Sequence, residues 1–339
     1  MTEREDLTRG AIGRTLVRFT LPMIAGALLQ QCYHLADTWI VGRYVGADAL
    51  AAVGSAYTLV VFLLSILMGL SLGSGTVFSL QYGAGRMQAM RRSIYVAVVL
   101  IGTVTCLLDA AALAALHPLL RLLRVPPQID AGMYVYLRIL LCGLVFTFIY
   151  NFQAALLRAV GDSVTPLRFL GLSVVLNIGL DLLFVVHLER GVEGAALATV
   201  IAQAAAALGI MGYTYVRHPE LRLRREDLVF DRRSLGEIAS FSALTCVQQS
   251  VMNLGILLVQ GLVNSFGPGV MAAFAVAVKI DAFAYMPVQE FGNAFSTFVA
   301  QNFGAGRHDR IRRGMRRALL IVSGFSVGVS SRFSCSPKC

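Results

Sequence analysis

Charged residues are scarce in this sequence. Aspartate, glutamate, lysine and arginine together make up 14% of its 339 residues, whereas soluble domains contain about 25%. Hydrophobic residues make up 57%, and the mean hydropathy is +0.70. These values exclude a soluble globular domain. They also exclude a nucleic-acid partner, because the arginines behind the net charge of +10 have no soluble folded surface on which to form a binding face.

Metal-binding motifs are missing as well. The sequence contains no His-Glu-x-x-His motif and no paired histidines. Cys32, Cys106, Cys142 and Cys246 stand singly in apolar segments, and we expect them to serve as small packing residues. We therefore expect neither an enzyme nor a bound cofactor.

Long apolar runs dominate the sequence. A run of about 20 mainly apolar residues is long enough to cross a bilayer as a helix. Such runs predict eight complete spanning segments and the start of a ninth near Ala318. We therefore expect an all-α polytopic membrane protein. The eight segments fall near residues 16–42, 50–80, 93–117, 133–157, 167–188, 192–216, 238–265 and 269–299.

Arginine clusters predict the orientation of these segments. Loops that face the cytoplasm carry an excess of lysine and arginine. With a cytoplasmic amino terminus, most arginines fall inside, in residues 4–18, 86–92, 158–168, 217–233 and 307–317. Few would then face outward, at Arg43, Arg121, Arg124, Arg138 and Arg190. We therefore expect the amino terminus to be cytoplasmic.

A repeat divides the sequence into two halves. The segment QYGAGRMQAMRR, which ends at Arg92, matches QNFGAGRHDRIRR, which ends at Arg313, so that Arg86 pairs with Arg307 at an offset of 221. Residues 46–54 fall opposite residues 267–275 at the same offset. The two matches predict parallel repeats related by an axis along the membrane normal.

The repeat also defines the expected domains. Residues 1–216 would form a complete six-helix lobe, residues 217–237 a cytoplasmic linker and residues 238–329 a partial second lobe. A complete second half would add roughly 100 residues and three helices, so we expect about eight or nine of twelve helices here. The polar residues 330–339 match nothing in the first half, which indicates either a truncation or a change of reading frame.

Acidic residues lie inside two of the apolar segments. Asp181 lies four residues after Asn177 in the fifth segment, and this spacing places both side chains on one helix face. Asp37 lies in the first segment, and the repeat pairs it with Leu258 rather than with an acid. An acid at the bilayer centre costs about 2.5–3.5 kcal/mol, so such residues usually face a cavity and have a function. The alternatives are a structural hydrogen bond between Tyr33 and Asp37 and polar contacts between helices.

Several motifs together carry a family resemblance. They are Pro22, the paired QYGAGR and QNFGAGR signatures, YHLADTWIVGRYVGADALAAVG (residues 33–54), LLRAVGDSVTPLRF (156–169), LNIGLDLLF (176–184) and GVEGAALATVIAQ (191–203). In their order and spacing, over residues 14 to about 325, the chain resembles the prokaryotic multidrug and toxic compound extrusion (MATE) family.

This resemblance implies two six-helix lobes around a V-shaped cleft, the second lobe being incomplete here. It implies an antiporter of the bacterial inner membrane that exports organic cations or amphipathic drugs in exchange for protons or sodium ions. The expected partners are a small-molecule substrate and the lipid bilayer, and we expect a monomer. The alternatives are a lipid-linked glycan flippase of related architecture and a truncated product that transports nothing.

The resemblance also assigns an ion-coupling site to the first lobe. Asp37 matches the acid of the family's first helix, Asn177 and Asp181 match a pair in the fifth helix, and Thr199 matches a threonine in the sixth. Tyr33 lies one turn before Asp37 and joins the set. Buried carboxylates can hold a proton, whereas the same oxygens, with the amide and the hydroxyl, can hold sodium. Both coupling ions remain open.

The second half offers a less defined substrate cleft. Its seventh segment carries amides, among them Gln248 and Asn253, but no acid between Ile238 and Phe266. In the eighth segment, Glu290 lies deep enough to line a cleft and contact a cationic substrate. Met286 would add an adaptable apolar surface beside it.

Overall fold

Helices form the architecture of this chain. The computed structural model describes residues 5–122, 127–264 and 268–334, and within these ranges there is no strand. The predicted all-α fold is confirmed. The helices are α1 (Ile12–Tyr44), α2 (Ala47–Gly83), α3 (Met87–Ala114), α4 (Leu116–Leu122), α5 (Pro127–Cys142), α6 (Leu144–Ala159), α7 (Val164–Asp181), α8 (Gly191–Arg217), α9 (Arg232–Asn264), α10 (Pro268–Gly304) and α11 (His308–Ser334).

The first six predicted segments correspond to helices of spanning length. Among the described residues, α1, α2, α3, α8 and the stretch Val164–His187 are long and apolar enough to cross a membrane. The fourth predicted segment is a bent pair, α5 and α6, which meet at 45°. Gly143 lies at this bend, and a Cβ there would come within 2.6 Å of Val200 on α8. The last three predicted segments fall within α9, α10 and α11.

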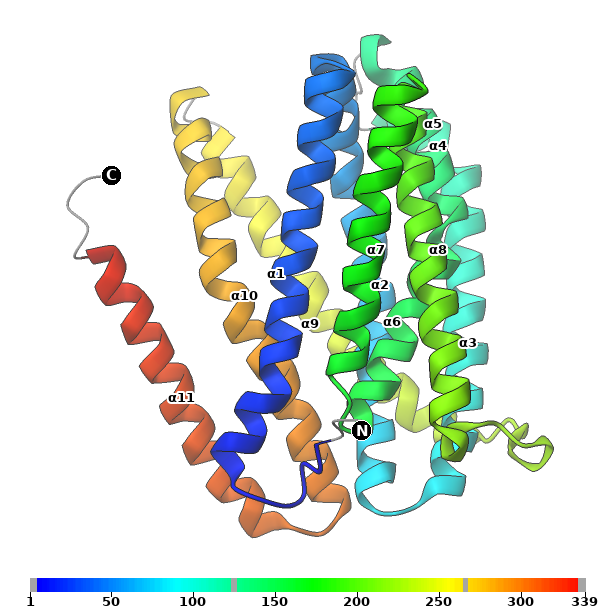
Figure 1. Ribbon diagram of the computed structural model, residues 1–339, viewed down its shortest axis with the longest axis vertical. Helices are drawn as coiled ribbons and strands as arrows, with labels where there is room; N and C mark the ends of the chain where they lie inside the picture. The colour runs from blue at the N-terminus through cyan, green and yellow to red at the C-terminus, as the bar shows by residue number, and fades with distance from the viewer. Residues whose placement is uncertain (1–4, 123–126, 265–267, 335–339) are drawn as a thin grey trace.

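The helices form two groups that meet at one end. Figure 1 shows α1 to α8 as one upright bundle, while α9, α10 and α11 spread away from it toward the top. The groups converge at the opposite end, which carries residues 5–10, 83–87 and 304–308. We call this the arginine-rich end. Helix α2 holds the groups together, because it packs against α9 and α10 as well as against α5 and α6.

Two glycines let α2 and α10 touch at the arginine-rich end. A Cβ at Gly83 would lie 2.7 Å from the carbonyl carbon of Gln301 and closer still to its oxygen. A Cβ at Gly304 would lie 2.9 Å from the carbonyl carbon of Leu80. The offset of 221 relates Gly83 to Gly304 and Leu80 to Gln301. The repeat found in the sequence thus appears in space as two reciprocal backbone contacts.

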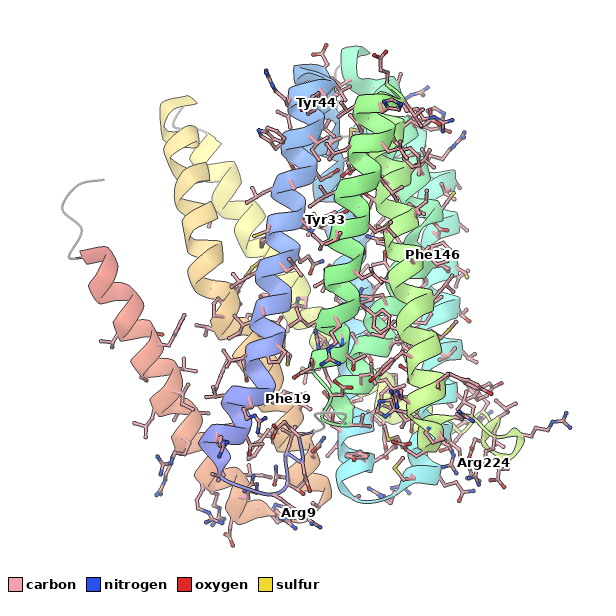
Figure 2. The ribbon with its side chains drawn as sticks, in the orientation of Figure 1. Arg9, Phe19, Tyr33, Tyr44, Phe146 and Arg224 are labelled. Atoms are coloured by element: carbon pink, nitrogen blue, oxygen red, sulfur yellow. The ribbon has the colours of Figure 1, made fainter. Side chains whose placement is uncertain are left out.

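The amino-terminal arm, residues 5–10, bridges the two groups. Glu5 donates its backbone N–H to the carbonyl of Gly161, between α6 and α7, at 3.1 Å. On the other side, the carbonyl of Leu7 accepts from Asn302 at 3.1 Å and from Arg310 at 3.3 Å. The Leu7 side chain is fully buried in a small cluster with Phe19, Phe298 and other apolar residues. Figure 2 shows this region around Arg9 and Phe19.

The segment between α8 and α9 is attached to the first group by a buried ion pair. It contains two short 3₁₀ turns, Pro219–Leu221 and Arg225–Asp227. Arg91 on α3 donates its Nε–H to Asp227 at 2.7 Å, and the Asp227 side chain is fully buried. Arg224 lies on the part of this segment that projects sideways from the bundle (Figure 2).

Candidate functional site

Four of the predicted ion-site residues come together inside the first group of helices. Asp37 lies on α1, Asn177 and Asp181 lie on α7, and Thr199 lies on α8. All four side chains are buried, with Asp181 at 0% exposure. We call these residues, together with Tyr33, the ion cluster.

Thr199 joins the three helices of the ion cluster. Its hydroxyl oxygen accepts a hydrogen bond from the Tyr33 hydroxyl at 3.2 Å and a longer one from the Asn177 amide at 3.4 Å. Small residues allow this approach: α8 buries Ala195 and Ala202, about one turn before and one turn after Thr199. The Tyr33 hydroxyl donates its hydrogen bond to Thr199 and not to Asp37, so the structure does not show the alternative of a structural hydrogen bond between Tyr33 and Asp37.

Three of the four carboxylate oxygens in the cluster are buried without a hydrogen-bond donor among the described residues. Within the described part of the chain, both oxygens of Asp181, one oxygen of Asp37 and the amide oxygen of Asn177 are buried without a hydrogen-bond partner. Asp37 also lies within electrostatic reach of Asp181. A buried charge without a partner is costly, so this arrangement favours a bound proton or cation among these oxygens.

A π-helical turn follows Asp181 directly. Residues Leu182–His187 continue α7 in π-helical geometry, and the backbone N–H of Leu188 bonds back to Leu183. Such turns are rare and occur frequently at functional sites. The apolar run in the sequence predicts one continuous helix here and contains no signal for this change.

Sequence reasoning missed Tyr136 on α5. Its side chain is buried, with 6% exposure, and lies within electrostatic reach of Asp37, Tyr33 and Asp181. A tyrosine inside an apolar segment was the available signal. The lone residue carried no spacing that would relate it to α1 or α7.

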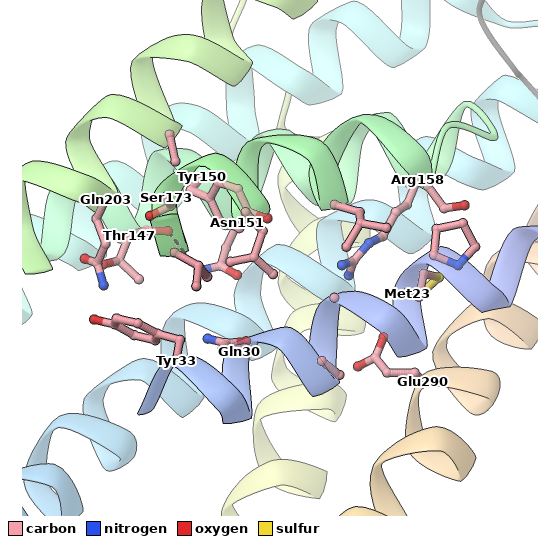
Figure 3. A pocket seen from close by; sticks show the side chains of 18 of the residues that line it. Met23, Gln30, Tyr33, Thr147, Tyr150, Asn151, Arg158, Ser173, Gln203 and Glu290 are labelled. Atoms are coloured by element: carbon pink, nitrogen blue, oxygen red, sulfur yellow. Dashed lines mark hydrogen bonds between the residues drawn. The ribbon is translucent and has the colours of Figure 1, made fainter. Parts of the chain in front are cut away.

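A polar cavity of about 130 Å³ extends from the ion cluster toward the arginine-rich end. Tyr33 lies at one end of it, and Arg158 and Glu290 lie at the other, with Gln30 and Asn151 between them (Figure 3). Thr147 and Gln203 also line it and are bonded to each other at 2.6 Å. The cavity thus connects α1, α6 and α8 of the first group with α10 of the second.

The three residues predicted for the substrate cleft whose side chains the structure describes do not gather in one place. Glu290 on α10 lines the cavity. Met286 is partly buried one turn earlier and does not line the cavity, while Gln248 is exposed on α9. The side chain of Asn253 lies outside the described residues.

One short sequence match to a hydrolase motif has the wrong structural context. Residues 69–73 read Gly-Leu-Ser-Leu-Gly, but they lie within the continuous helix α2, where Ser71 is buried. The serine nucleophile of that motif requires a sharp turn between a strand and a helix. The match therefore carries no catalytic argument.

Comparison with known proteins decides the family. The family model MatE matches residues 22–183 and 245–338. The chain belongs to the MATE family of transporters. The probable multidrug resistance protein YpnP of Bacillus subtilis is 32% identical over 306 residues, which cover 90% of this chain and 68% of YpnP. The predicted family and its multi-pass membrane character are confirmed.

Two further similarities extend this picture. The FAD transporter of Shewanella oneidensis is 25% identical over 335 residues, which cover 96% of this chain and 73% of that protein. The solved structure of an outward-facing multidrug resistance MATE family transporter matches with a TM-score of 0.92 at 23% identity. That match covers 99% of this chain and 75% of the other, and it establishes the fold. The relatives are transporters rather than enzymes.

Proposed function

We propose that this MATE chain is a secondary antiporter that exports organic cations or amphipathic drugs in exchange for protons or sodium ions. It would act as a monomer in the bacterial inner membrane, with its amino terminus in the cytoplasm. The observation that carries the proposal is the ion cluster, in which both carboxylate oxygens of Asp181 and one of Asp37 are buried without a hydrogen-bond donor among the described residues.

The cluster gives a physical reason for coupling. Two buried carboxylates within electrostatic reach repel each other unless a proton or a cation neutralises them. Binding would therefore favour a close arrangement of α1 and α7, and release would loosen it. Pro22 lies inside α1 and cannot donate the backbone hydrogen bond of its position, so α1 has a site at which it can bend.

Multidrug export is the activity that the names of most of these relatives indicate. YpnP of B. subtilis and NorM of Thermotoga maritima are both described as probable multidrug resistance proteins. The present chain spans 68% and 69% of the lengths of these two relatives. We therefore assign transport of organic cations to this chain as a proposal that a flux measurement must test.

The test is transport by the purified chain in proteoliposomes. A proton or sodium gradient should drive uptake of a fluorescent organic cation such as ethidium, and Asp37→Asn and Asp181→Asn should each abolish that uptake. Asp48→Asn is the matched control, because Asp48 is an exposed acid at the start of α2. Gradient-driven uptake by both cluster variants at the wild-type rate would refute the assignment.

Ion binding can be followed separately from transport. The chain contains one tryptophan, Trp39, two residues after Asp37 on α1. Its fluorescence should respond to added sodium or to pH in the wild-type protein and in Asp48→Asn. The same titration should leave the fluorescence of Asp37→Asn unchanged.

A further inference from the structure

We propose that the polar cavity is a hydrated route by which the coupling cation moves between the ion cluster and the arginine-rich end, with Glu290 as the carboxylate that receives it. This inference rests on the proposed antiport. It assigns Glu290 a role different from the substrate contact expected from the sequence.

The size of the cavity favours a route for ions over a drug site. Pockets that hold drug-sized ligands measure about 300–1,000 Å³, whereas this cavity measures about 130 Å³. A buried water needs about 10–15 Å³ of space by this measure, so the cavity has room for several waters. A short file of waters can carry a proton or part of the hydration shell of a sodium ion.

The lining is polar enough to hold water. Cavities stay dry when their walls are apolar, and a buried water needs two to four polar partners. Here Gln30, Asn151, Ser173 and the bonded pair Thr147–Gln203 contribute polar side chains. In Figure 3, Thr147, Gln203 and Ser173 lie near the Tyr33 end, and Gln30 and Asn151 lie between that end and Arg158.

Tyr33 belongs both to the ion cluster and to the wall at one end of the cavity. Tyr33 lines the cavity, and its hydroxyl donates to Thr199 at 3.2 Å. The same Thr199 oxygen accepts from Asn177. These two hydrogen bonds link the cavity wall at Tyr33 to Asn177, which lies on the same helix as Asp181.

Glu290 provides an acceptor at the other end. One of its carboxylate oxygens accepts a hydrogen bond from Asn293 at 3.2 Å, and the other is buried without a hydrogen-bond partner in the described part of the chain. This second oxygen can receive a proton or contact a cation. Because Glu290 belongs to α10, the route ends between the two groups of helices.

Arg158 explains why a cation would not stay at this end. It lines the cavity near Glu290, and its Nε is likewise buried without a hydrogen-bond partner among the described residues. A fixed positive charge beside the acceptor lowers its affinity for a second cation. Conduction requires binding that is strong enough for entry and weak enough for exit.

The experiment separates the rate of ion exchange from the affinity of the cluster. The full chain is reconstituted, and vesicles are selected through an amino-terminal tag so that the arginine-rich end faces outward. After a step in external pH or sodium, the relaxation of Trp39 fluorescence gives the exchange rate, and titration gives the affinity. The variants are Glu290→Gln and Glu290→Asp, with Glu237→Gln as the control, because Glu237 is a partly exposed acid of α9 outside the cavity.

We expect Glu290→Gln to slow the exchange roughly tenfold or more, with an affinity close to that of the wild type. Glu290→Asp should recover most of the rate, and Glu237→Gln should match the wild type. If Glu290→Gln exchanged ions at the wild-type rate, or bound them as weakly as Asp37→Asn, the proposed route would be refuted and the proposed antiport would stand. A wild-type protein whose Trp39 ignores both ions would overturn the proposed coupling and the route with it.

Discussion

Alanine at Gly83 or Gly304 should weaken the contact between the two helix groups at the arginine-rich end. Both glycines are within helices, where alanine would ordinarily stabilise the fold by about 0.4–1 kcal/mol. The neighbouring backbone reverses this expectation. At Gly83 the new Cβ would lie 2.7 Å from the Gln301 carbonyl carbon, and at Gly304 it would lie 2.9 Å from that of Leu80.

The size of the effect follows from these distances. Ordinary contact begins at 3.4 Å, so α2 and α10 must separate by more than half an ångström. The atoms that block the Cβ belong to the backbone, and a change of side-chain rotamer cannot relieve the clash. Overpacking of this kind costs roughly 1–3 kcal/mol, and for a chain of 339 residues it should lower the melting temperature by about 1–4 °C.

The assay is the melting temperature of the detergent-purified protein, compared with matched controls on the same helices. Gly54 on α2 and Gly292 on α10 have open space where a Cβ would be placed. Gly83→Ala and Gly304→Ala should melt below the wild type, while Gly54→Ala and Gly292→Ala should melt at or above it. Equal melting temperatures for all four variants would refute the close backbone contact.

Two further predictions concern the arm and the segment after α8. Leu7→Ala should lower the free energy of unfolding by about 2–5 kcal/mol, because the Leu7 side chain is fully buried. Leu21→Ala is the control and should melt near the wild type, because Leu21 on α1 is 57% exposed. Equal melting temperatures for the two variants would contradict the burial of the arm. Burial alone would raise the pKa of Asp227, but hydrogen bonds from Arg91 and from the backbone of Arg224 hold it below its ordinary value. A carboxyl group whose pKa is lower in the folded than in the unfolded protein stabilises the fold at pH values above the unfolded pKa. This stabilisation is lost as the pH falls through the folded pKa. The difference in melting temperature between wild type and Asp227→Asn should therefore stay constant down to about pH 4 and shrink below it. A difference that stays constant below pH 4 as well would contradict the ion pair.

Much of the site could be predicted from local spacing. The four-residue step from Asn177 to Asp181 predicts that both side chains lie on one face of a helix, and both are buried on α7. Asp37 and Thr199 needed the family resemblance as well, because spacing within one segment says nothing about a second segment. Tyr136 had neither signal and was missed.

The sequence by itself determined that this chain is a helical membrane protein of the MATE family with a repeat at an offset of 221. The length of the apolar segments and the order of the motifs can be read from the sequence without knowing how the helices pack. Only the tertiary structure decided that Thr199 accepts from Tyr33 and Asn177, that Glu290 shares a cavity with Tyr33, and that the arm bridges both helix groups. These contacts depend on how far each helix is rotated and shifted against its neighbours. Side-chain volumes across many segments set that packing together, and helical periodicity within one segment does not encode it.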